Sequence, residues 1–295
     1  PRHSHWGLSP ADNLAYQAAA YARLWPSGRV ARLHGVILPT TEFPFGALAV
    51  EEIVGRAPRL PAELDELADA LSAIHSLPMP RVTAPLIDQR DPVAATLEMV
   101  LAQAAYMAAA GIAIESRRQI EDEIAWARQF AAEARTRPQP RCLVATDTQP
   151  GNFVVTAAGR AFLVDLEKSL YGSPAIDLAH ATLYPSTGWD PAVNATLEAG
   201  EVRRFYRRYL TAAEPGFAAA LEPWLAPMRR LTWLRTITIF AKMMAECRAG
   251  TWPGLALEPA FRAHALAHIA RCHRPETIAR ARGEWLGTGG LELHR

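Results

Sequence analysis

The sequence has 295 residues, of which 50% are hydrophobic, and a formal net charge of +1 at pH 7. A chain of this length and composition can bury one large core or two coupled lobes, so it is globular. The near-neutral charge argues against nucleic acid or a membrane surface as partner, and the longest uncharged stretch, residues 99–114, is too short to cross a bilayer, which takes about 20 apolar residues.

The first predicted elements are one helix and two β-like runs. Asp12 or Asn13 can cap a helix that continues through residues 15–24 and stops before a proline. Residues 30–38 and 47–53 follow as short apolar runs typical of strands.

The next part of the chain is predicted to be helical. Apolar residues recur at helical spacing over residues 64–74, and His75 ends this segment. We interpret His75 as a packing and capping residue rather than a catalytic one, because a histidine at a helix C-terminus interacts favourably with the helix dipole. After a proline-punctuated linker at residues 79–92, helices are predicted over 93–110 and 116–135.

The most informative segment covers residues 143–165. Asp147 follows a β-like run, Asn152 comes five positions later, and a second pair of apolar runs joined through Gly159 ends at Asp165. This spacing is that of three residues in protein-kinase-like enzymes. The first, an Asp, accepts the substrate proton, and the Asn and the later Asp bind magnesium. The pattern therefore indicates phosphoryl transfer.

The chemistry explains the residue types. A nucleotide triphosphate concentrates negative charge, and magnesium prefers hard oxygen ligands such as the carbonyl of Asn152 and the carboxylate of Asp165. Asp147, which is not needed for the metal, can orient a substrate hydroxyl and take its proton.

Beyond residue 174 the chain is predicted to be helical again. The segments are 198–213, 216–248 and 258–283. Strands gather early and helices late, which predicts an α+β protein with two lobes.

These features together resemble the aminoglycoside phosphotransferase and choline kinase family. That family has a His-Gly-Asp-x-x-x-x-Asn loop, a hairpin ending in Asp, and a Gly-Asp-Pro-x-x-Asp-Leu-Ala segment, which residues 172–179 match in spacing. The resemblance implies a kinase-like fold with a small β-rich lobe and a large helical lobe. It also implies that Asp147 is the catalytic base, that Asn152 and Asp165 bind magnesium, and that Asp177 steadies the catalytic loop from a helix start.

The sequence departs from the family pattern in its catalytic motifs. Ala145 and Thr146 replace the His and Gly before the catalytic Asp, and Ser173 replaces the Asp of the third motif. Lys168 and Lys242 are the only lysines. Lys168 is compatible with a surface charge and with a phosphate contact.

The front of the chain also differs, since no Gly-x-Gly-x-x-Gly precedes residue 51. We therefore expect the sequence to start inside the small lobe, with Arg2 as the basic residue of the lobe's third strand. The resemblance assigns residues 15–24 to the lobe's C helix, with Gln17 where the family has a Glu. It implies that residues 1–55 are the remainder of the nucleotide-binding lobe and 56–295 the catalytic and acceptor-binding lobe.

The resemblance also implies how nucleotide and acceptor bind. Backbone groups of Glu51, Glu52 and Ile53, in a hinge at about residues 51–55, would meet the adenine edge of ATP or GTP. Trp189 and Asp190 would suit a cationic amine, although a Trp beside Gly is commonly a packing anchor. The residues do not choose between an aminoglycoside-, choline- or sugar-like acceptor.

Three functions remain open. The first is an ATP- or GTP-dependent, magnesium-dependent O-phosphotransferase acting on a small molecule. The second is a degraded relative that binds nucleotide without turnover, suggested by Gln17, Ala145 and the missing strand Lys. The third, metal-assisted hydrolysis, is disfavoured because no His-rich metal motif accompanies the carboxylates. Three cysteines without paired spacing indicate a reducing, cytoplasmic compartment.

Overall fold

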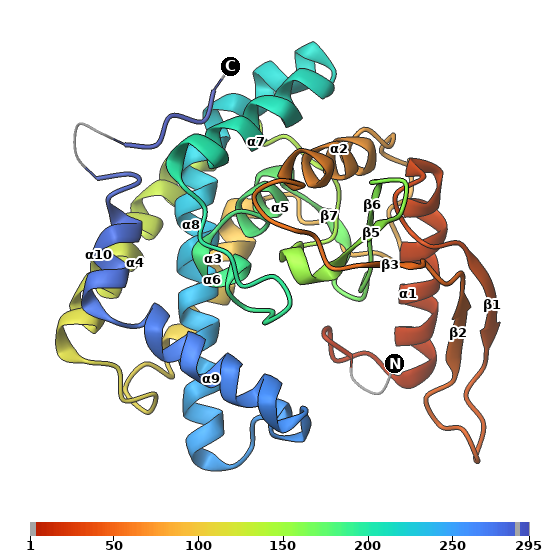
Figure 1. Cartoon of the computed structure of the whole chain (residues 1–295), viewed down its shortest axis with the longest axis horizontal. Coiled ribbons are helices and arrows are strands. Elements are labelled where there is room, and N and C mark those ends of the chain that lie inside the picture. The colour runs from red at the N-terminus through yellow and green to blue at the C-terminus, as the bar shows by residue number, and fades with distance from the viewer. Residues whose placement is uncertain (1–3, 287–289, 295) are drawn as a thin grey trace.

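Helices dominate the structure, and three small antiparallel sheets connect its parts (Figure 1). The computed structural model describes residues 4–286 and 290–294. The helices of this part of the chain are α1 (Pro10–Leu24), α2 (Leu64–His75), α3 (Pro92–Ala104), α4 (Ile114–Ala134), α5 (Pro174–His180), α6 (Tyr184–Thr187), α7 (Ala199–Ala212), α8 (Pro215–Ala249), α9 (Pro259–Cys272) and α10 (Pro275–Arg282). The strands are β1 (Leu33–Ile37), β2 (Ala47–Val50), β3 (Gly55–Arg56), β4 (Cys142–Val144), β5 (Phe153–Thr156), β6 (Ala161–Leu163) and β7 (Leu170–Gly172). This mixture confirms the predicted α+β class.

Helix α1 and the hairpin of β1 and β2 lie together on one side of the molecule, opposite α4 and α10 (Figure 1). The strands of the hairpin are antiparallel, with Ile37 opposite Ala47. The predicted cap of α1 is wrong: Ser9 is the N-cap, and its Oγ accepts from the backbone N–H of Asp12 at 3.2 Å. The helix starts earlier than expected because Pro10, whose fixed φ suits the first turn, follows this Ser.

The strands of two further sheets are interleaved along the sequence. In one, β5 pairs with both β3 and β6, and in the other β4 pairs with β7. Residues 145–152 therefore connect β4 to β5, while residues 164–169 connect β6 to β7. Because the strands at both ends of these two connections are paired, the connections run side by side. One carries Asp147 and Asn152, and the other carries Asp165.

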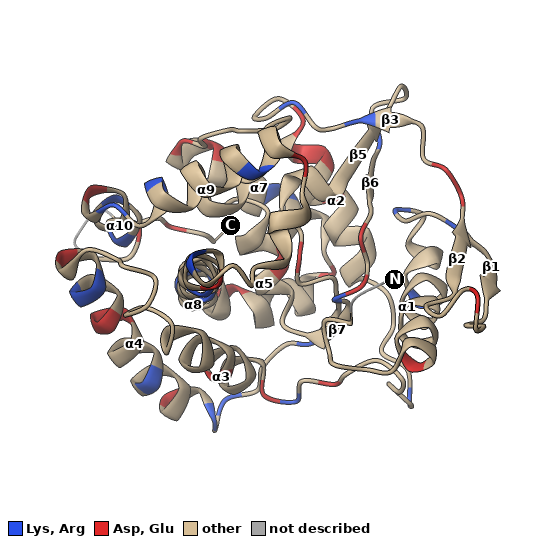
Figure 2. Ribbon diagram, turned by 90° about the horizontal axis from the view of Figure 1, so that it is seen from below, with Lys and Arg blue, Asp and Glu red and all other residues tan. Residues whose placement is uncertain are grey.

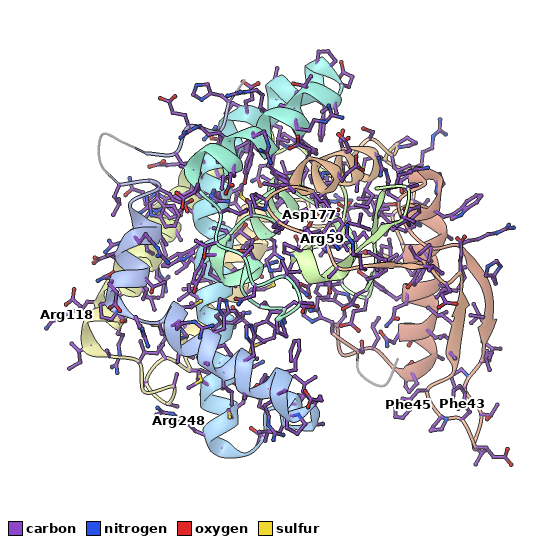
Figure 3. The ribbon with its side chains drawn as sticks, viewed as in Figure 1. Phe43, Phe45, Arg59, Arg118, Asp177 and Arg248 are labelled. Atoms are coloured by element: carbon purple, nitrogen blue, oxygen red, sulfur yellow. The ribbon has the colours of Figure 1, made fainter. Side chains whose placement is uncertain are left out.

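The long helix α8 forms the centre of the helical part and packs against α3 and α5. Its interior side chains are buried in the main hydrophobic core, Trp233 and Leu234 among them. Figure 3 shows Asp177 inside this helical part, while Phe43 and Phe45 lie at the far end of the β1–β2 hairpin. Arginines and acidic residues are both spread along α4 (Figure 2).

One long helix predicted over residues 258–283 is wrong, because the structure divides it into α9 and α10. Arg274 has φ −69° and ψ 140°, an extended conformation, and Pro275 begins α10. A proline cannot continue a helix and disfavours the helical conformation in the residue before it, which explains the break. None of the helices in the described part of the chain has the length and apolar run needed to span a bilayer.

Candidate functional site

A cavity of about 370 Å³ opens beside the two connections between the small sheets. Asp147, Asn152 and Asp165 all line it, so the structure brings together the three side chains that the sequence spacing selected. The opposite walls come from α3, α6, α8 and α9. The volume is within the range of small-molecule sites, which begins near 300 Å³.

Asp177, in the first turn of α5, fixes the loop that carries Asp147 by hydrogen bonds to its backbone. One carboxylate oxygen of Asp177 accepts from the backbone N–H of Ala145 and the other from that of Thr146, both at 2.8 Å. The hydroxyl of Thr148 donates to the backbone carbonyl of Asp177 at 2.7 Å. Asp177 is fully buried, so these charge-assisted bonds lie away from competing water.

His75 supports Asp177 in turn. Its Nε2 lies 3.1 Å from Oδ2 of Asp177, and its Nδ1 lies 2.9 Å from the hydroxyl of Tyr209. His75 is buried, and the line of contacts runs from α7 through α2 to the loop that carries Asp147. The structure therefore gives this histidine a place behind the loop and not in the cavity wall.

Two residues beside the cavity have unusual backbone conformations. Thr146 has φ 61° and Asp165 has φ 58°, both in the left-handed region that favours glycine. Such a conformation costs roughly 1–3 kcal/mol and persists only where surrounding contacts enforce it. At Thr146 these contacts include Asp177 and Arg235, whose guanidinium donates to the Thr146 carbonyl at 2.9 Å.

The carboxylate of Asp147 is in contact with two basic side chains. Nζ of Lys168 lies 2.5 Å from its Oδ2, and Nδ1 of His180 lies 3.8 Å from its Oδ1. Burial alone would raise the pKa of Asp147, but the attraction of Lys168, His180 and Arg235 outweighs it and lowers the pKa below the ordinary value. Asp147 is therefore ionised at neutral pH.

Asn152 is tied to the same loop. Its Nδ2 donates to the backbone carbonyl of Asp147 at 2.8 Å, and its Oδ1 accepts from Nε2 of Gln149 at 2.9 Å. The short 3₁₀ turn Pro150–Asn152 makes this return possible. Gly151, in its middle, lies so close to Asp190 that an added Cβ would be 2.4 Å from a carboxylate oxygen.

The side chains of Asn152 and Asp165 have the chemistry that a magnesium ion requires. Burial and the neighbouring charge of Asp147 raise the pKa of Asp165, and a bound divalent cation would reverse this effect. Asp165 and Asn152 both offer hard oxygen ligands to the cavity. Within the described ranges no three His, Cys, Asp or Glu side chains gather as a closed metal site. Two protein ligands suit magnesium, which usually takes its other ligands from phosphates and water.

Three basic residues of the site were not identified from the sequence. Lys168 was left open, and neither His180 nor Arg235 was considered. His180 follows Asp177 by three positions on α5, a spacing that brings side chains to one helix face and could have indicated it. Arg235 has no local signal, because α8 reaches the site only through tertiary packing.

The predicted nucleotide contacts lie away from this cavity. Glu51 and Glu52 are exposed and Ile53 is half-buried, in the segment between β2 and β3, and the N–H of Glu51 donates to the carbonyl of Arg32 at 2.8 Å. Gln17 is buried in α1, with Nε2 3.5 Å from Oδ1 of Asn13. Arg2 lies outside the described residues.

Of the two predicted acceptor contacts, Trp189 lines the cavity. Its ring stacks on Phe240, with centroids 5.5 Å apart, and meets Phe261 edge-on. Asp190 instead organises the turn that follows, where its Oδ1 accepts from the backbone N–H of Ala192 at 2.8 Å. The carboxylate of Asp190 is therefore beside Gly151 and not in the cavity wall.

Comparison with known families gave one match for most of the chain. A model described as the APH phosphotransferase enzyme family matches residues 2–223. No curated protein matches the sequence.

Several solved structures share the fold. The ethanolamine kinase of Plasmodium vivax superposes with a TM-score of 0.56 at 12% identity, and the alignment covers 91% of this chain and 74% of the kinase. The choline kinase of Cryptosporidium parvum has a TM-score of 0.55 at 14% identity, covering 96% of this chain and 81% of its own. The AMP-bound spectinomycin phosphotransferase has a TM-score of 0.54 at 14% identity, covering 94% and 84%. At sequence identities this low, the comparisons show that the fold is shared and no more.

Proposed function

The chain belongs to the phosphotransferase enzyme family, and from this premise we propose that it transfers the terminal phosphoryl group of ATP or GTP to a hydroxyl group of a small molecule. The observation that carries the proposal is the convergence of Asp147, Asn152 and Asp165 on one cavity. The family match confirms the resemblance and the phosphotransferase class expected from the sequence. The structural neighbours confirm the kinase-like fold.

Asp147 is the base in this proposal. Its lowered pKa keeps the carboxylate ionised at neutral pH, ready to accept the proton of the acceptor hydroxyl. Its position is fixed by the backbone bonds of Ala145 and Thr146 to Asp177, so little reorganisation is needed when the acceptor binds. A positioned base of this kind contributes roughly 10²–10⁴ to the rate.

Asn152 and Asp165 are the proposed ligands of magnesium. The ion, when bound, neutralises charge on the phosphate oxygens of the nucleotide. The contact of Asn152 with the Asp147 carbonyl holds the proposed ligand and the proposed base in one rigid unit.

Lys168 provides the positive charge next to the base. Burial alone lowers its pKa, but the neighbouring carboxylates of Asp147 and Asp165 outweigh burial and raise it, so the ammonium is charged. Its flexible stem lets it leave Asp147 and contact a phosphate oxygen of the donor. We propose that Lys168 neutralises Asp147 until the nucleotide binds, and then helps to neutralise the phosphoryl group in transfer.

The nucleotide is proposed to bind next to the segment between β2 and β3. Residues 51–54 connect the hairpin of β1 and β2 to the sheet that contains β5, as a hinge would. The spectinomycin phosphotransferase and the amicoumacin kinase were solved with AMP and AMP-PNP respectively, which supports an adenine nucleotide as donor. Glu51, Glu52 and Ile53 remain the proposed contacts of the adenine ring of the nucleotide.

The test is nucleotide turnover in Asp147→Asn. Purified protein is given magnesium nucleotide and a panel of alcohols, and both nucleotide binding and nucleoside diphosphate release are measured. We expect acceptor-dependent release to fall roughly 10²–10⁴-fold in the variant, with nucleotide binding retained. Glu121→Gln, on the exposed face of α4, is the matched control. Equal turnover in Asp147→Asn and the parent would refute the proposed base, and binding without turnover in both would favour a degraded binding protein.

A further inference from the structure

The half of the cavity farther along α8 has an apolar wall. It is formed by side chains from α3, the turn after α6, α8 and α9: Met99, Trp189, Ile239, Phe240, Met243 and Phe261. One face of the Trp189 ring is covered by Phe240, and Phe261 meets it edge-on. The rings pack on one another and present an apolar surface, instead of surrounding an empty space as the aromatic cage of a quaternary ammonium does.

This half of the cavity has no spare negative charge. Among the described residues of the whole wall, the carboxylates are Asp147 and Asp165, and both belong to the phosphoryl-transfer chemistry. The nearby carboxylate of Asp190 bonds to its own turn, and Glu246 lies 3.6 Å from Lys242. A polycationic acceptor would therefore find no carboxylate of its own.

Positive charge also reaches this region. Lys168 and Arg235 both line the cavity. The pKa of His180 is lowered to about 4, chiefly by burial and further by Arg235 and Lys168, although Asp147 opposes the effect. The pKa of His5, which also lines the cavity, is lowered to about 4 by burial, Lys168 and Arg235. Lys168 and Arg235 therefore balance the charges of Asp147 and Asp165, and the cavity offers a cationic ligand no net attraction.

Three neutral side chains of the wall carry a buried polar atom. Nδ1 of His180, Oγ of Ser186 and Oε1 of Gln89 are buried without a hydrogen-bond partner among the described residues. A buried polar atom without a partner costs roughly 1–3 kcal/mol, so such atoms are usually satisfied by something.

We propose that the acceptor is a neutral alcohol with an apolar, ring-sized body, and not a polyamine or a quaternary ammonium compound. The apolar body lies against Trp189, Phe240 and Phe261, and its hydroxyl points to Asp147. The polar side chains of the wall that it meets besides the carboxylates, Gln89, Ser186 and His180 among them, are neutral. The assignment of the reacting hydroxyl rests on the proposed function, whereas the preference for a neutral ligand can be measured without it.

A neutral and a charged probe test this preference. para-Methylbenzyl alcohol and para-(aminomethyl)benzyl alcohol differ in charge and little in size, and choline and kanamycin serve as strongly cationic probes. Binding is measured without nucleotide by saturation-transfer NMR and by competition. We expect the neutral probe to bind at least about tenfold more tightly than the charged one.

Variants locate the site. Phe240→Ala should weaken the neutral probe by roughly tenfold, whereas Phe43→Ala, at the exposed tip of the β1–β2 hairpin (Figure 3), should leave it unchanged. Because Phe240 is 4% exposed and also packs in the core, Met243→Glu provides a second test in a half-buried position. It should reverse the preference in favour of the aminomethyl probe.

The outcomes separate this inference from the proposed function. It is overturned if the aminomethyl probe binds as tightly as the methyl probe, if neither binds, or if Phe240→Ala and Met243→Glu both leave the preference unchanged. Phosphorylation of choline or kanamycin that depends on Asp147 would overturn it while supporting the proposed function. Selective binding of the neutral probe, with no nucleotide turnover on any acceptor, would support it while contradicting the proposed function.

Discussion

Lys168 and Asp147 form an ion pair across the two connections between the small sheets, with Nζ 2.5 Å from Oδ2. The side chains are 27% and 20% exposed, so the pair is partly shielded from water. The proposed base is therefore not a free carboxylate, and its protonation depends on a cation from the neighbouring loop.

Lys168→Met should change the pH dependence of turnover. Since Lys168 is a major contributor to the lowered pKa of Asp147, its removal should raise that pKa. The acid limb of the kcat/KM profile should then move to higher pH, and kcat/KM at neutral pH should fall on the order of 10²-fold. Lys168→Arg, which keeps the charge, should retain the acid limb near its original position. An acid limb that stays in place in Lys168→Met would show that the ion pair does not control the base.

Asp177→Ala should destabilise the protein as well as the loop. The substitution leaves the buried N–H groups of Ala145 and Thr146 without their acceptor, and His75 with Tyr209 as its remaining partner. We expect the free energy of unfolding to fall by about 3 kcal/mol or more, as measured in urea. Thr40→Ala, in the exposed turn between β1 and β2, is the control. A loss below about 1 kcal/mol would contradict the role given to these bonds.

We expect His180 to make the free energy of unfolding depend on pH. Its folded pKa is about 4, below the ordinary 6.5, so the unfolded chain binds this proton first as the pH falls. The contribution of His180 is therefore fully present above pH 6.5 and is lost between pH 6.5 and about 4, by roughly 3 kcal/mol in total.

The measurement is urea unfolding across that window. His180→Asn should flatten the loss of stability on acidification, because Asn does not titrate. His34→Asn, at an exposed position of β1, controls for the removal of a histidine. If both variants lose stability with the same slope as the parent, His180 is not buried in its neutral form.

Gly151→Ala should impair turnover without unfolding the protein. The new Cβ would lie 2.4 Å from a carboxylate oxygen of Asp190 and 2.7 Å from its Cβ, so the turn that positions Asn152 must shift. A displacement near 1 Å in an active site costs roughly 10²-fold in rate. Gly200→Ala, at the start of α7 where the added Cβ meets nothing within 4 Å, should have no such effect. Full activity in Gly151→Ala would contradict a positioning role for this turn.

Local patterns in the sequence predicted most of the helices and the hairpin of β5 and β6, but not the break between α9 and α10. The spacing of Asp147, Asn152 and Asp165 also predicted a shared site, because sequence-adjacent strands fix where such residues lie. Strand β7 was missed, since three residues become a strand only through their pairing with β4, which is distant in the chain. His180 and Arg235 were missed, and Lys168 was left between a surface charge and a phosphate contact, for a related reason: their partners are assembled by tertiary packing.

Helix α8 and helix α9 supply most of the apolar wall, while the connections between the sheets supply the carboxylates and Lys168. The two halves of the cavity are thus encoded in separate stretches of the gene. Substitutions at Ile239 or Met243 can redirect the choice of compound while the residues of the chemical step stay as they are. For a laboratory-evolution experiment, a library confined to these two helices is the economical way to search for new acceptors.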